Sequence, residues 1–374
     1  MRVEEILDRN TLDRNTWNDT LRKLPYAHIL QSWEWGDFKH ITTGWQPTRL
    51  AFYDDNNQIV AMVSVLTRQI AFLRVMYVPK GAVLAYEDES LRNTVLDYLK
   101  QFAKQRMAIW LKIDPDIPVA TGVPNTPDDK PVSVGQSLKA HLSQTNWRFS
   151  DDQVQFRNTL VIDLSRDEET LLAEMSQNTR RKIRTAEKKG IIIKNATLDD
   201  LPILYDLYRV TGERDHFLTR PPAYYERAWR DFMVAGLAHA LIAYDGDTPI
   251  AHIILFHFGR KCWYFYGASS NISREKMPNY LLQWEGMKWA KAQGYALYDM
   301  WGAPNDFVES DRLWGVYQFK QGFRGDVVRH IGAWDYAPYP PLYWLYTQAM
   351  PRLMGFIRRI RHGKSSSSAS ENEE

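Results

Sequence analysis

The sequence predicts an α+β protein made of two similar domains side by side, and three observations support this prediction. The chain has 374 residues, which is too many for one ordinary domain. Its hydrophobic fraction of 44% is enough to fill more than one core. The predicted elements also follow one order, hairpin, strand, helix and strand, twice along the chain. Because ligands often bind between domains, we expect the functional site in the cleft between these two units.

A short helix precedes the first unit. Residues 31–39 carry apolar rings at helical spacing, and Ser32 can cap the helix so that Trp35 packs inward. Lys39 falls on the same side of this helix as Trp35. It is either a solvated charge at the helix end or a contact to a ligand.

The first unit is marked by β-rich runs and one amphipathic helix. Its hairpin folds around a polar turn, and its helix places apolar residues on a single face. The hairpin, strand, helix and strand are expected at residues 48–67, 75–81, 89–104 and 109–115. Residues 119–134 are rich in Pro, Asp and Gly and predict an exposed loop.

The second unit repeats this order. Its hairpin, strand, helix and strand are expected at residues 237–258, 261–267, 278–293 and 296–301, with a Gly-Ala-Pro turn at 302–304. This order is typical of an N-acetyltransferase-like (GNAT-like) core, which is an analogy of fold alone. We therefore predict a first GNAT-like domain at residues 1–156 plus 328–362 and a second GNAT-like domain at residues 157–327.

A strongly basic helix is predicted between the two units, at residues 178–190. Helical geometry places Arg180, Arg184 and Lys188 on one stripe, with Arg181 nearby. These charges either form a solvated face or contact a phosphate backbone, where each contact adds affinity by counterion release. The helix ends at a glycine and a strand follows at once. We see no sustained heptads and expect no coiled-coil arm.

Residues 317–325 contain one lysine, Lys320, between aromatic residues and ahead of two glycines. The pattern fits a strand end with a surface lysine. It also fits a site where aromatic walls lower the dielectric constant, so that an ammonium acts strongly on a developing negative charge. Glycines would let the backbone approach a ligand there.

The C-terminal part predicts a helix and a tail. Residues 343–361 are rich in Trp, Tyr, Leu and Met and end with Arg358, Arg359 and Arg361. They fit either a peripheral helix on a membrane surface or a terminal helix docked on the first domain. Residues 363–374 are Ser-rich and acidic, and this composition predicts disorder.

Composition limits the compartment and the partners. The formal net charge is +2, so binding to a polyanion depends on local clusters of charge. Cys262 is the only cysteine, which excludes an intrachain disulfide and a thiolate metal cluster and fits a reducing cytoplasm. The N-terminus is acidic, unlike a signal peptide, and no run approaches the roughly 18 apolar residues of a membrane-spanning helix. We expect a cytoplasmic protein.

Several catalytic classes lose their support because their motifs are missing. His252 and His257 are five positions apart on a predicted strand and point to opposite faces, so we expect no metal site. The sequence has no HExxH, GxSxG or P-loop motif. It also lacks the Gln/Arg-x-x-Gly-x-Gly/Ala turn with which acetyltransferases hold the coenzyme A pyrophosphate. A doubled GNAT-like chain without this turn is expected to use another activated acyl donor.

Five motifs, taken in order, carry a resemblance to a known family. They are Gln31-Ser32-Trp33-Glu34-Trp35-Gly36, Ala186-Glu187-Lys188-Lys189-Gly190, Tyr264-Phe265-Tyr266-Gly267-Ala268-Ser269, Trp301-Gly302-Ala303 and Phe319-Lys320-Gln321-Gly322-Phe323. In this order the chain resembles the FemABX family from Gln31 to Arg329, nearer to its armless branch. Those proteins are aminoacyl-tRNA-dependent, non-ribosomal peptidyl transferases that build the interpeptide branches of peptidoglycan.

The resemblance implies a role for particular residues. Lys320 and Phe319 match the family's catalytic pair at the reacting ester, where the lysine stabilises charge on the tetrahedral intermediate and on the departing ribose oxygen. We expect this lysine to stay charged throughout. The positions that match the family's binding site for the nucleotide diphosphate and the muramyl-peptide acceptor are Lys39, Arg220, Tyr224 and Tyr266.

The donor side is assigned less directly. Because the arm is missing, we assign the tRNA contact to the basic helix, at Arg180, Arg181, Arg184, Lys188 and Lys189. Asp114 is the candidate base, although its Asp-Pro-Asp turn equally suits a structural role. No cofactor is expected, since the aminoacyl ester of the co-substrate is already activated. The acceptor is a nucleotide- or lipid-linked peptidoglycan precursor, with peripheral contact to the inner face of the membrane. Two alternatives remain, a coenzyme A-dependent N-acyltransferase and a non-catalytic scaffold at the membrane surface.

Overall fold

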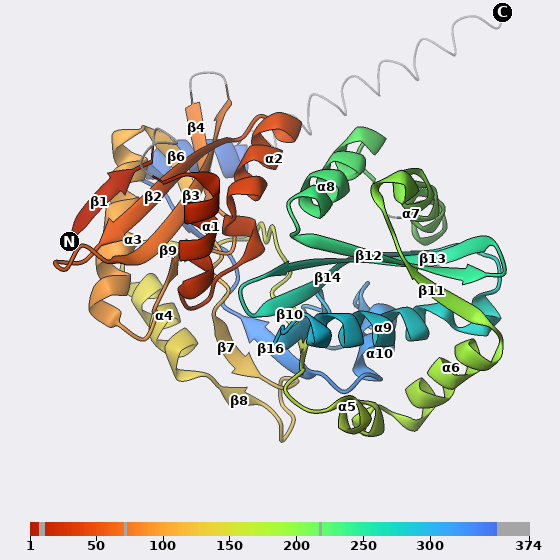
Figure 1. Cartoon of the computed structure of the whole chain (residues 1–374). Helices are drawn as coiled ribbons and strands as arrows, with labels where there is room; N and C mark the ends of the chain where they lie inside the picture. The colour runs from red at the N-terminus through yellow and green to blue at the C-terminus, as the bar shows by residue number, and fades with distance from the viewer. Residues whose placement is uncertain (7–11, 71–72, 217–218, 350–374) are drawn as a thin grey trace, which may run out of the picture.

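The computed structural model describes residues 1–6, 12–70, 73–216 and 219–349. Two mixed β-sheets lie side by side in it (Figure 1). In spatial order the first sheet consists of β1 (Arg2–Glu5), β2 (Gln46–Tyr53), β3 (Ile59–Ile70), β4 (Leu73–Val78), β6 (Ala108–Ile113), β17 (Trp334–Tyr336) and β9 (Trp147–Phe149), with β5 (Val83–Leu84) paired to β3. Its helices are α1 (Arg14–Lys23), α2 (Trp33–Thr43), α3 (Glu89–Gln105), α4 (Ser133–Gln144) and α11 (Pro340–Trp344).

The second sheet is longer. In spatial order it consists of β11 (Ile191–Asn195), β12 (Ala238–Asp245), β13 (Thr248–Phe258), β14 (Lys261–Ser269), β15 (Leu297–Asp299), β10 (Asn158–Asp163), β16 (Asp326–His330), β7 (Pro118–Thr121) and β8 (Lys130–Pro131). Its helices are α5 (Glu168–Glu174), α6 (Gln177–Lys188), α7 (Leu201–Asp215), α8 (Pro222–Val234), α9 (Pro278–Ala292) and α10 (Trp314–Gln321).

The two sheets share one internal arrangement. In the first, the parallel strands β4 and β6 are joined by α3, and in the second the parallel strands β14 and β15 are joined by α9. A parallel pair needs a crossover connection, and these amphipathic helices supply it while covering one face of the sheet. The remaining pairs in both sheets are antiparallel. The predicted doubling of hairpin, strand, helix and strand is confirmed, and no coiled-coil arm is evident in the described residues.

A shared hydrophobic core joins the two halves. Helix α2 begins where the Ser32 side chain accepts a hydrogen bond from the Trp35 backbone N–H, as predicted. Its buried rings then meet those of α8 from the second half: the centroids of Trp35 and Phe232 are 6.1 Å apart, and those of Phe38 and Tyr224 are 4.9 Å apart. The relative placement of the two sheets is therefore fixed by packed aromatic side chains.

Two expectations of secondary structure need correction. Residues 119–134 were expected to form an exposed loop, but β7 and β8 lie at the two ends of this region and extend the second sheet, with Ala120 paired to Arg329 of β16, while residues 122–129 form neither strand nor helix. Pairing with a strand from a distant part of the chain outweighs the loop-like composition. Lys320 was compatible with an exposed strand end, but it is buried on helix α10. Its buried neighbour Tyr317 lies one helical turn before it, so the aromatic spacing serves a helix.

The C-terminal helix is described only as far as residue 349. Tyr339 and Tyr343 donate hydrogen bonds from their hydroxyls to the Lys104 carbonyl and to Asp335, so this segment contacts the first half. The predicted Arg358, Arg359 and Arg361 and the predicted disordered tail lie outside the described residues. Within the described ranges no helix combines the length and the apolar character that crossing a membrane would need.

Candidate active site

Lys320 is held in a buried setting at the end of α10. Its side chain is 5% exposed, and its ammonium donates hydrogen bonds to the backbone carbonyls of Trp301 and Gly302, the latter at 2.7 Å. The Tyr264 ring lies nearby, with 5.9 Å between Nζ and the ring centroid. An ammonium has three protons. Two are therefore directed at carbonyls, which leaves the third for a developing negative charge.

The two carbonyls come from a turn that immediately follows β15. Trp301 and Gly302 both have positive φ, 53° and 44°. A positive φ is uncommon for a residue with a side chain, so Trp301 needs compensating contacts. At Gly302, a Cβ would lie 3.0 Å from the Phe156 ring, so the turn also requires glycine there. This unusual backbone directs two successive carbonyls toward one lysine.

The buried surroundings change the titration of Lys320. Burial lowers the pKa of Lys320 to about 7, against the opposing effect of Asp299. The lowered pKa acts against the prediction that this lysine is charged throughout, because it brings the ammonium and the amine closer in free energy in the free protein. A nearby negative charge on a substrate would favour the ammonium.

Phe319 does not share the environment of Lys320. Its ring packs against Tyr280, with 4.9 Å between centroids, and against Phe323, at 5.3 Å. Tyr280 in turn accepts a hydrogen bond from Lys182 of α6. The predicted pair is thus adjacent in sequence, but its two side chains have different neighbours.

The glycine that follows α10 lets another helix approach. A Cβ on Gly322 would lie 2.3 Å from the Thr179 hydroxyl, and the Gly322 carbonyl accepts a 2.9 Å hydrogen bond from the Ser176 backbone N–H. The N-terminus of α6 therefore packs directly against the segment that carries Lys320. We had expected this glycine to admit a ligand, and in the structure it admits the basic helix.

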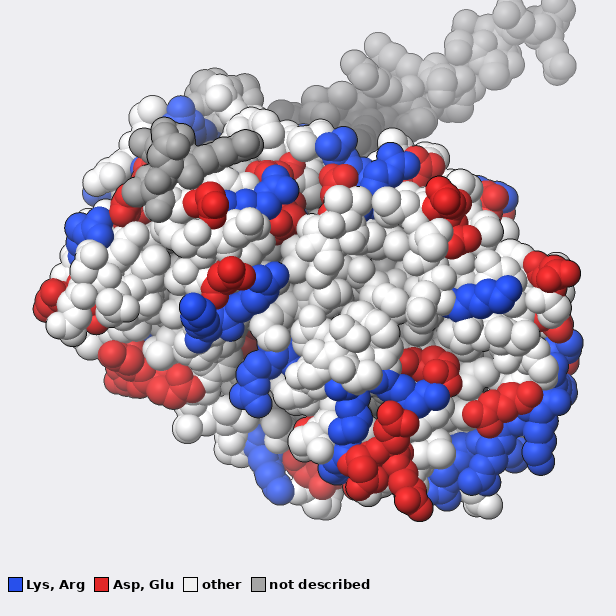
Figure 2. Space-filling model, in the orientation of Figure 1, with Lys and Arg blue, Asp and Glu red and all other residues white. Residues whose placement is uncertain are grey.

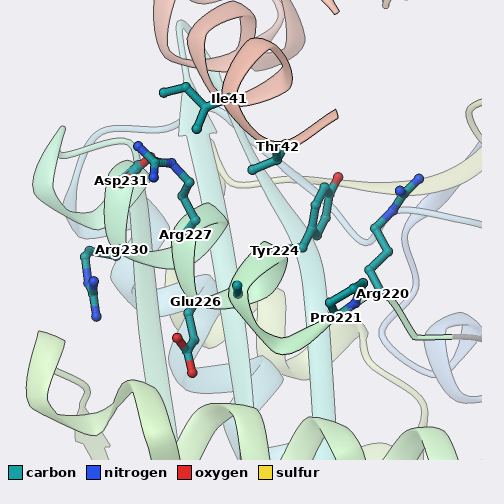
Figure 3. Close-up of a pocket in the computed structure, with 10 residues that line it drawn as sticks. Ile41, Thr42, Arg220, Pro221, Tyr224, Glu226, Arg227, Arg230 and Asp231 are labelled. Atoms are coloured by element: carbon teal, nitrogen blue, oxygen red, sulfur yellow. The ribbon is translucent and has the colours of Figure 1, made fainter. Parts of the chain in front are cut away.

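The predicted acceptor residues form one group at the boundary between the two halves, and Figure 3 shows two of them, Arg220 and Tyr224. Lys39 of α2 donates a 2.8 Å hydrogen bond to the hydroxyl of Tyr224 on α8, and the Arg220 guanidinium lies 4.8 Å from the Tyr224 ring centroid. Burial and the charge of Arg220 lower the pKa of Lys39 to about 8. Tyr266 packs against Tyr225, the neighbour of Tyr224, at 6.1 Å. The structure brings all four predicted residues together.

A hollow of about 510 Å³ opens next to this group. Figure 3 shows it between α2, which contributes Ile41 and Thr42, and α8, which contributes Tyr224 and Arg227. Arg220 and Arg230 also line it. Glu226 and Asp231 line it as well, and Asp231 pairs with Arg227 at 3.1 Å. The guanidinium group of Arg220 next to the Lys39 ammonium suits an anionic ligand with oxygens to pair.

An aromatic path links the acceptor group to Lys320. Phe265 lies between Tyr266 and Trp301, with ring centroids 6.3 Å and 4.4 Å away. Trp301 also supplies one of the carbonyls that bind Lys320. The sequence motif containing Trp301 was noticed only as part of a resemblance. In the structure this residue connects the two parts of the site.

The basic helix α6 presents its charges on the outer surface. Arg181, Arg184, Lys188 and Lys189 are exposed, while Thr179, Ile183 and Ala186 face the core. Figure 2 shows a gathering of positive side chains at the lower right, where Figure 1 places α6. The predicted stripe, Arg180, Arg184 and Lys188, lines one hollow of about 650 Å³ between α5 and α6, together with Arg181.

Asp114 lies in the first half and has structural partners. It accepts hydrogen bonds from the Tyr77 hydroxyl and from the Lys80 backbone N–H, each at 2.6 Å. Burial raises the pKa of Asp114 to about 6, opposed chiefly by Lys80. Both partners hold the turn that follows β6, which is the structural role considered for this residue.

Sequence reasoning missed a buried group of charges where the two halves meet. Asp116 is 2.5 Å from Lys261 of the second half, 3.6 Å from Lys80 and 3.3 Å from His330. Burial alone would raise its pKa, but these groups hold the pKa of Asp116 well below its usual range. The only signal in the sequence was a second aspartate in the Asp-Pro-Asp turn. Its partners lie far away in sequence and could not be inferred.

The described residues offer no set of three or more His, Cys, Asp or Glu side chains able to hold a metal ion. His252 and His257 point to opposite faces of β13, as predicted: His252 packs near Trp229 of α8, and His257 accepts or donates a 2.6 Å hydrogen bond with Tyr295, beyond α9. The pKa of each is lowered by burial. Both are buried residues of the core.

Comparisons with known sequences address the family of the chain. The model of the FemAB family matches residues 12–244 and 234–350. A protein named Lipid II:glycine glycyltransferase from Staphylococcus aureus (strain MRSA252) is 28% identical over 401 residues, covering 88% of this chain and 92% of that protein. A protein of the same name from Staphylococcus epidermidis is 26% identical over 399 residues, with the same coverage.

Comparisons with solved structures address the fold. The crystal structure of FemX superposes with a TM-score of 0.80 at 22% identity, covering 92% of this chain and 99% of that chain. A tandem GNAT protein from the clavulanic acid biosynthesis pathway has a TM-score of 0.51 at 10% identity, covering 90% and 99%. The predicted fold of two GNAT-like units is confirmed.

Proposed function

The chain belongs to the FemAB family, and we propose from this premise that it transfers an amino acid from aminoacyl-tRNA to an amine of a peptidoglycan precursor. The relatives named as lipid II:glycine glycyltransferases support an aminoacyltransferase acting on such precursors. The structural observation that carries the proposal is Lys320, a buried ammonium fixed by two carbonyls and joined through Trp301 to a group of cationic side chains.

The reaction needs positioning and charge stabilisation more than a strong base. The acceptor amine attacks the ester carbonyl, a C–N bond forms, and the C–O bond to the tRNA ribose breaks. The amine proton leaves with the ribose oxygen, so the products are an amide and uncharged tRNA. The free N–H of Lys320 would stabilise the oxyanion and then the departing ribose oxygen. No cofactor is required in this proposal.

The acceptor would bind between α2 and α8. Phosphate oxygens are suited to the Arg220 guanidinium and the Lys39 ammonium, while Tyr224 and Tyr266 add hydroxyl groups and aromatic surface. The aromatic path through Phe265 and Trp301 would lead the peptide part toward Lys320. The diphosphate is common to nucleotide-linked and lipid-linked muramyl peptides, and both are offered in the experiment below.

The direct test replaces Lys320 and measures transfer of a labelled amino acid. The variant Lys320→Met should lose about a hundredfold to a thousandfold in kcat, because one preorganised donor to an oxyanion is worth that much, while acceptor binding stays nearly unchanged. Purified protein is incubated with mixed charged tRNAs and either acceptor, and mass spectrometry names the amino acid added. Unchanged transfer by the variant would remove the central claim.

A matched control is available on the neighbouring helix. Lys291 of α9 also donates its ammonium to a backbone carbonyl, that of Leu164, at 2.8 Å. It contacts neither the turn after β15 nor the acceptor group. Lys291→Met should therefore keep the wild-type transfer rate, and an equal loss in both variants would mean that lysine removal acts through the fold.

The donor tRNA would lie across α6. This helix packs by its N-terminus against Gly322, so a phosphate backbone bound to Arg180, Arg184 and Lys188 would lead toward Lys320. Replacing these three residues with Glu should weaken tRNA binding and reduce the slope of log affinity against log salt by about 3, since each lost phosphate contact removes about 0.9. An unchanged slope would show that the helix face is only solvated.

Peripheral membrane contact is proposed for the segment around α11. Leu342, Trp344 and Leu345 are exposed there, by 38%, 57% and 47%. An aromatic and aliphatic surface of this kind favours the interface of a bilayer, and we place the protein in the cytoplasm at the inner face of the membrane. Co-sedimentation with anionic vesicles should fall when Trp344 is replaced by Ser. The same experiment without loss of binding would contradict this placement.

The two alternative functions have their own tests. Binding of acetyl-CoA in calorimetry would support a coenzyme A-dependent N-acyltransferase. Amino-acid transfer at a normal rate by the purified protein would exclude a non-catalytic scaffold.

A further inference from the structure

Asp299 is a buried carboxylate next to the candidate site that the proposed reaction does not use. It is the last residue of β15, it is 2% exposed, and its strand lies in the second sheet between β14 and β10. A buried aspartate is rare unless it is paired or hydrogen-bonded. Its contacts therefore indicate what it contributes.

The first contribution is geometric. One carboxylate oxygen of Asp299 accepts a 2.8 Å hydrogen bond from the Trp301 backbone N–H and another from the Thr159 hydroxyl of β10. The first bond spans the point at which the chain enters its left-handed turn. It favours a conformation of Trp301 that is otherwise uncommon. The carbonyls of Trp301 and Gly302 are thereby directed at Lys320.

The second contribution is electrostatic. Lys320 lacks a carboxylate partner within ion-pair distance among the described residues, and Asp299 is the acidic group that opposes the effect of burial on its pKa. Burial raises the pKa of Asp299, and the charge of Lys261, which belongs to the buried group around Asp116, opposes that rise. A negative charge near a buried lysine favours the charged form of the lysine.

We propose that Asp299 is a positioning residue for the transfer reaction, acting on Lys320 through the turn at Trp301 and Gly302. It holds the two carbonyls that orient the ammonium, and its negative charge favours the ammonium form of Lys320. The part of this inference that concerns catalysis depends on the proposed function. The part that concerns the titration of Lys320 does not.

The test separates shape from charge. Asp299→Asn keeps an oxygen that can accept from the Trp301 N–H but removes the negative charge, whereas Asp299→Ala removes both. With Asn, we expect the Lys320 titration to move to lower pH and kcat at pH 8 to fall about tenfold, with partial recovery at lower pH. KM for the acceptor should stay the same. With Ala, kcat should fall further at every pH, because the turn is no longer held.

Lys320 is also followed directly. The full-length protein is labelled with lysine that carries ¹³C at Cε, and the Cε signals are recorded by NMR as a function of pH. The signal that is missing in Lys320→Met belongs to Lys320. A lower titration midpoint in Asp299→Asn than in the wild type supports the proposal. Because the NMR titration does not need transfer activity, this result can be told apart from failure of the proposed function, in which the wild type itself transfers no amino acid. An unchanged midpoint together with an unchanged pH profile of kcat would overturn it.

Two further variants guard against a simple loss of fold. Asp335→Asn is the matched control, because Asp335 is also a buried carboxylate with a raised pKa but contacts Lys112, Ser150 and Tyr343. It should leave the Lys320 titration unchanged. If Asp299→Asn does not fold, Thr159→Val removes one hydrogen bond from the same carboxylate and should shift the Lys320 midpoint in the same direction by a smaller amount. No shift in Thr159→Val would then count against the proposal.

Discussion

The ends of β6 and β15 both have a buried aspartate that binds the following turn, but the two sites differ in the lysine beside them. Each strand is the second of a parallel pair. A buried aspartate, Asp114, directly follows β6, and a buried aspartate, Asp299, is the last residue of β15. Asp114 accepts a tyrosine hydroxyl and the Lys80 backbone N–H, and Asp299 accepts a threonine hydroxyl and the Trp301 backbone N–H. A doubled fold has therefore kept the same way of fixing the turn after the crossover.

The difference lies in the lysine beside each turn. Lys80 has the carboxylate of Asp116 within 3.6 Å, whereas Lys320 is bonded to two backbone carbonyls. A carbonyl carries only a partial charge and satisfies an ammonium less completely than a carboxylate does. The buried lysine of the first half is thus paired with a carboxylate, Asp116, which also binds Lys261 of the second half. The second half leaves its lysine able to act on another negative charge.

The largest expected effect on the contrast between the two lysines comes from removing the carboxylate of Asp116. The variant Asp116→Ala leaves the ammonium groups of Lys80 and Lys261 in a buried position without their carboxylate, which should cost about 3–5 kcal/mol of unfolding free energy. Urea denaturation measures this loss. Asp55→Ala is the control, because the Asp55 side chain is 98% exposed, and it should stay within about 0.5 kcal/mol of the wild type. Equal losses in the two variants would show that Asp116 does not join the halves.

The dependence of stability on pH would sharpen the contrast. Burial lowers the pKa of Lys320 from 10.5 to about 7, so between these values the unfolded chain binds a proton that the folded chain has lost. Stability should therefore rise with pH in this window, by at most about 1.4 kcal/mol per unit from this group. Lys320→Met should remove that rise, whereas Lys291→Met should retain it. Urea denaturation at pH 7, 8 and 9 measures the slopes, and identical slopes in all three proteins would contradict the assignment.

The smallest expected effect comes from removing the hydroxyl group that binds each aspartate, that of Tyr77 at Asp114 or that of Thr159 at Asp299. Tyr77→Phe and Thr159→Val each remove one hydrogen bond to the matched aspartates and should each cost about 1 kcal/mol of unfolding free energy. Only Thr159→Val should also lower the transfer rate, because only Asp299 adjoins Lys320. Parallel denaturation and transfer assays test both statements. A slower Tyr77→Phe enzyme with an unaffected Thr159→Val would reverse the roles given to the two ends.

The sequence was sufficient for features that depend on local pattern. Amphipathic spacing predicted α3 and α9, alternating β-rich runs predicted the long hairpins, and Ser32 correctly marked the start of α2. The acceptor residues were named through a resemblance, and the structure places Lys39, Arg220 and Tyr224 in contact.

Features that depend on distant partners could not be predicted. Nothing near Lys320 in sequence states that carbonyls from residues 301 and 302 will bind it, and the pKa that results from burial follows only from the folded environment. The Asp116 group joins segments more than a hundred positions apart. Residues 118–131 have the composition of a loop, and only the exposed edge of β16 makes strands of them.

Each half of the chain contributes strands to the sheet of the other half, so the protein cannot be cut into two independent pieces. Residues 118–131 belong to the N-terminal half but finish the second sheet, and β17 returns from the C-terminal half to the first sheet, where it lies between β6 and the edge strand β9. A break at residue 156 would give two fragments, each lacking a piece that the other carries. Neither fragment should be soluble by itself, and co-expression should restore both sheets through fragment complementation.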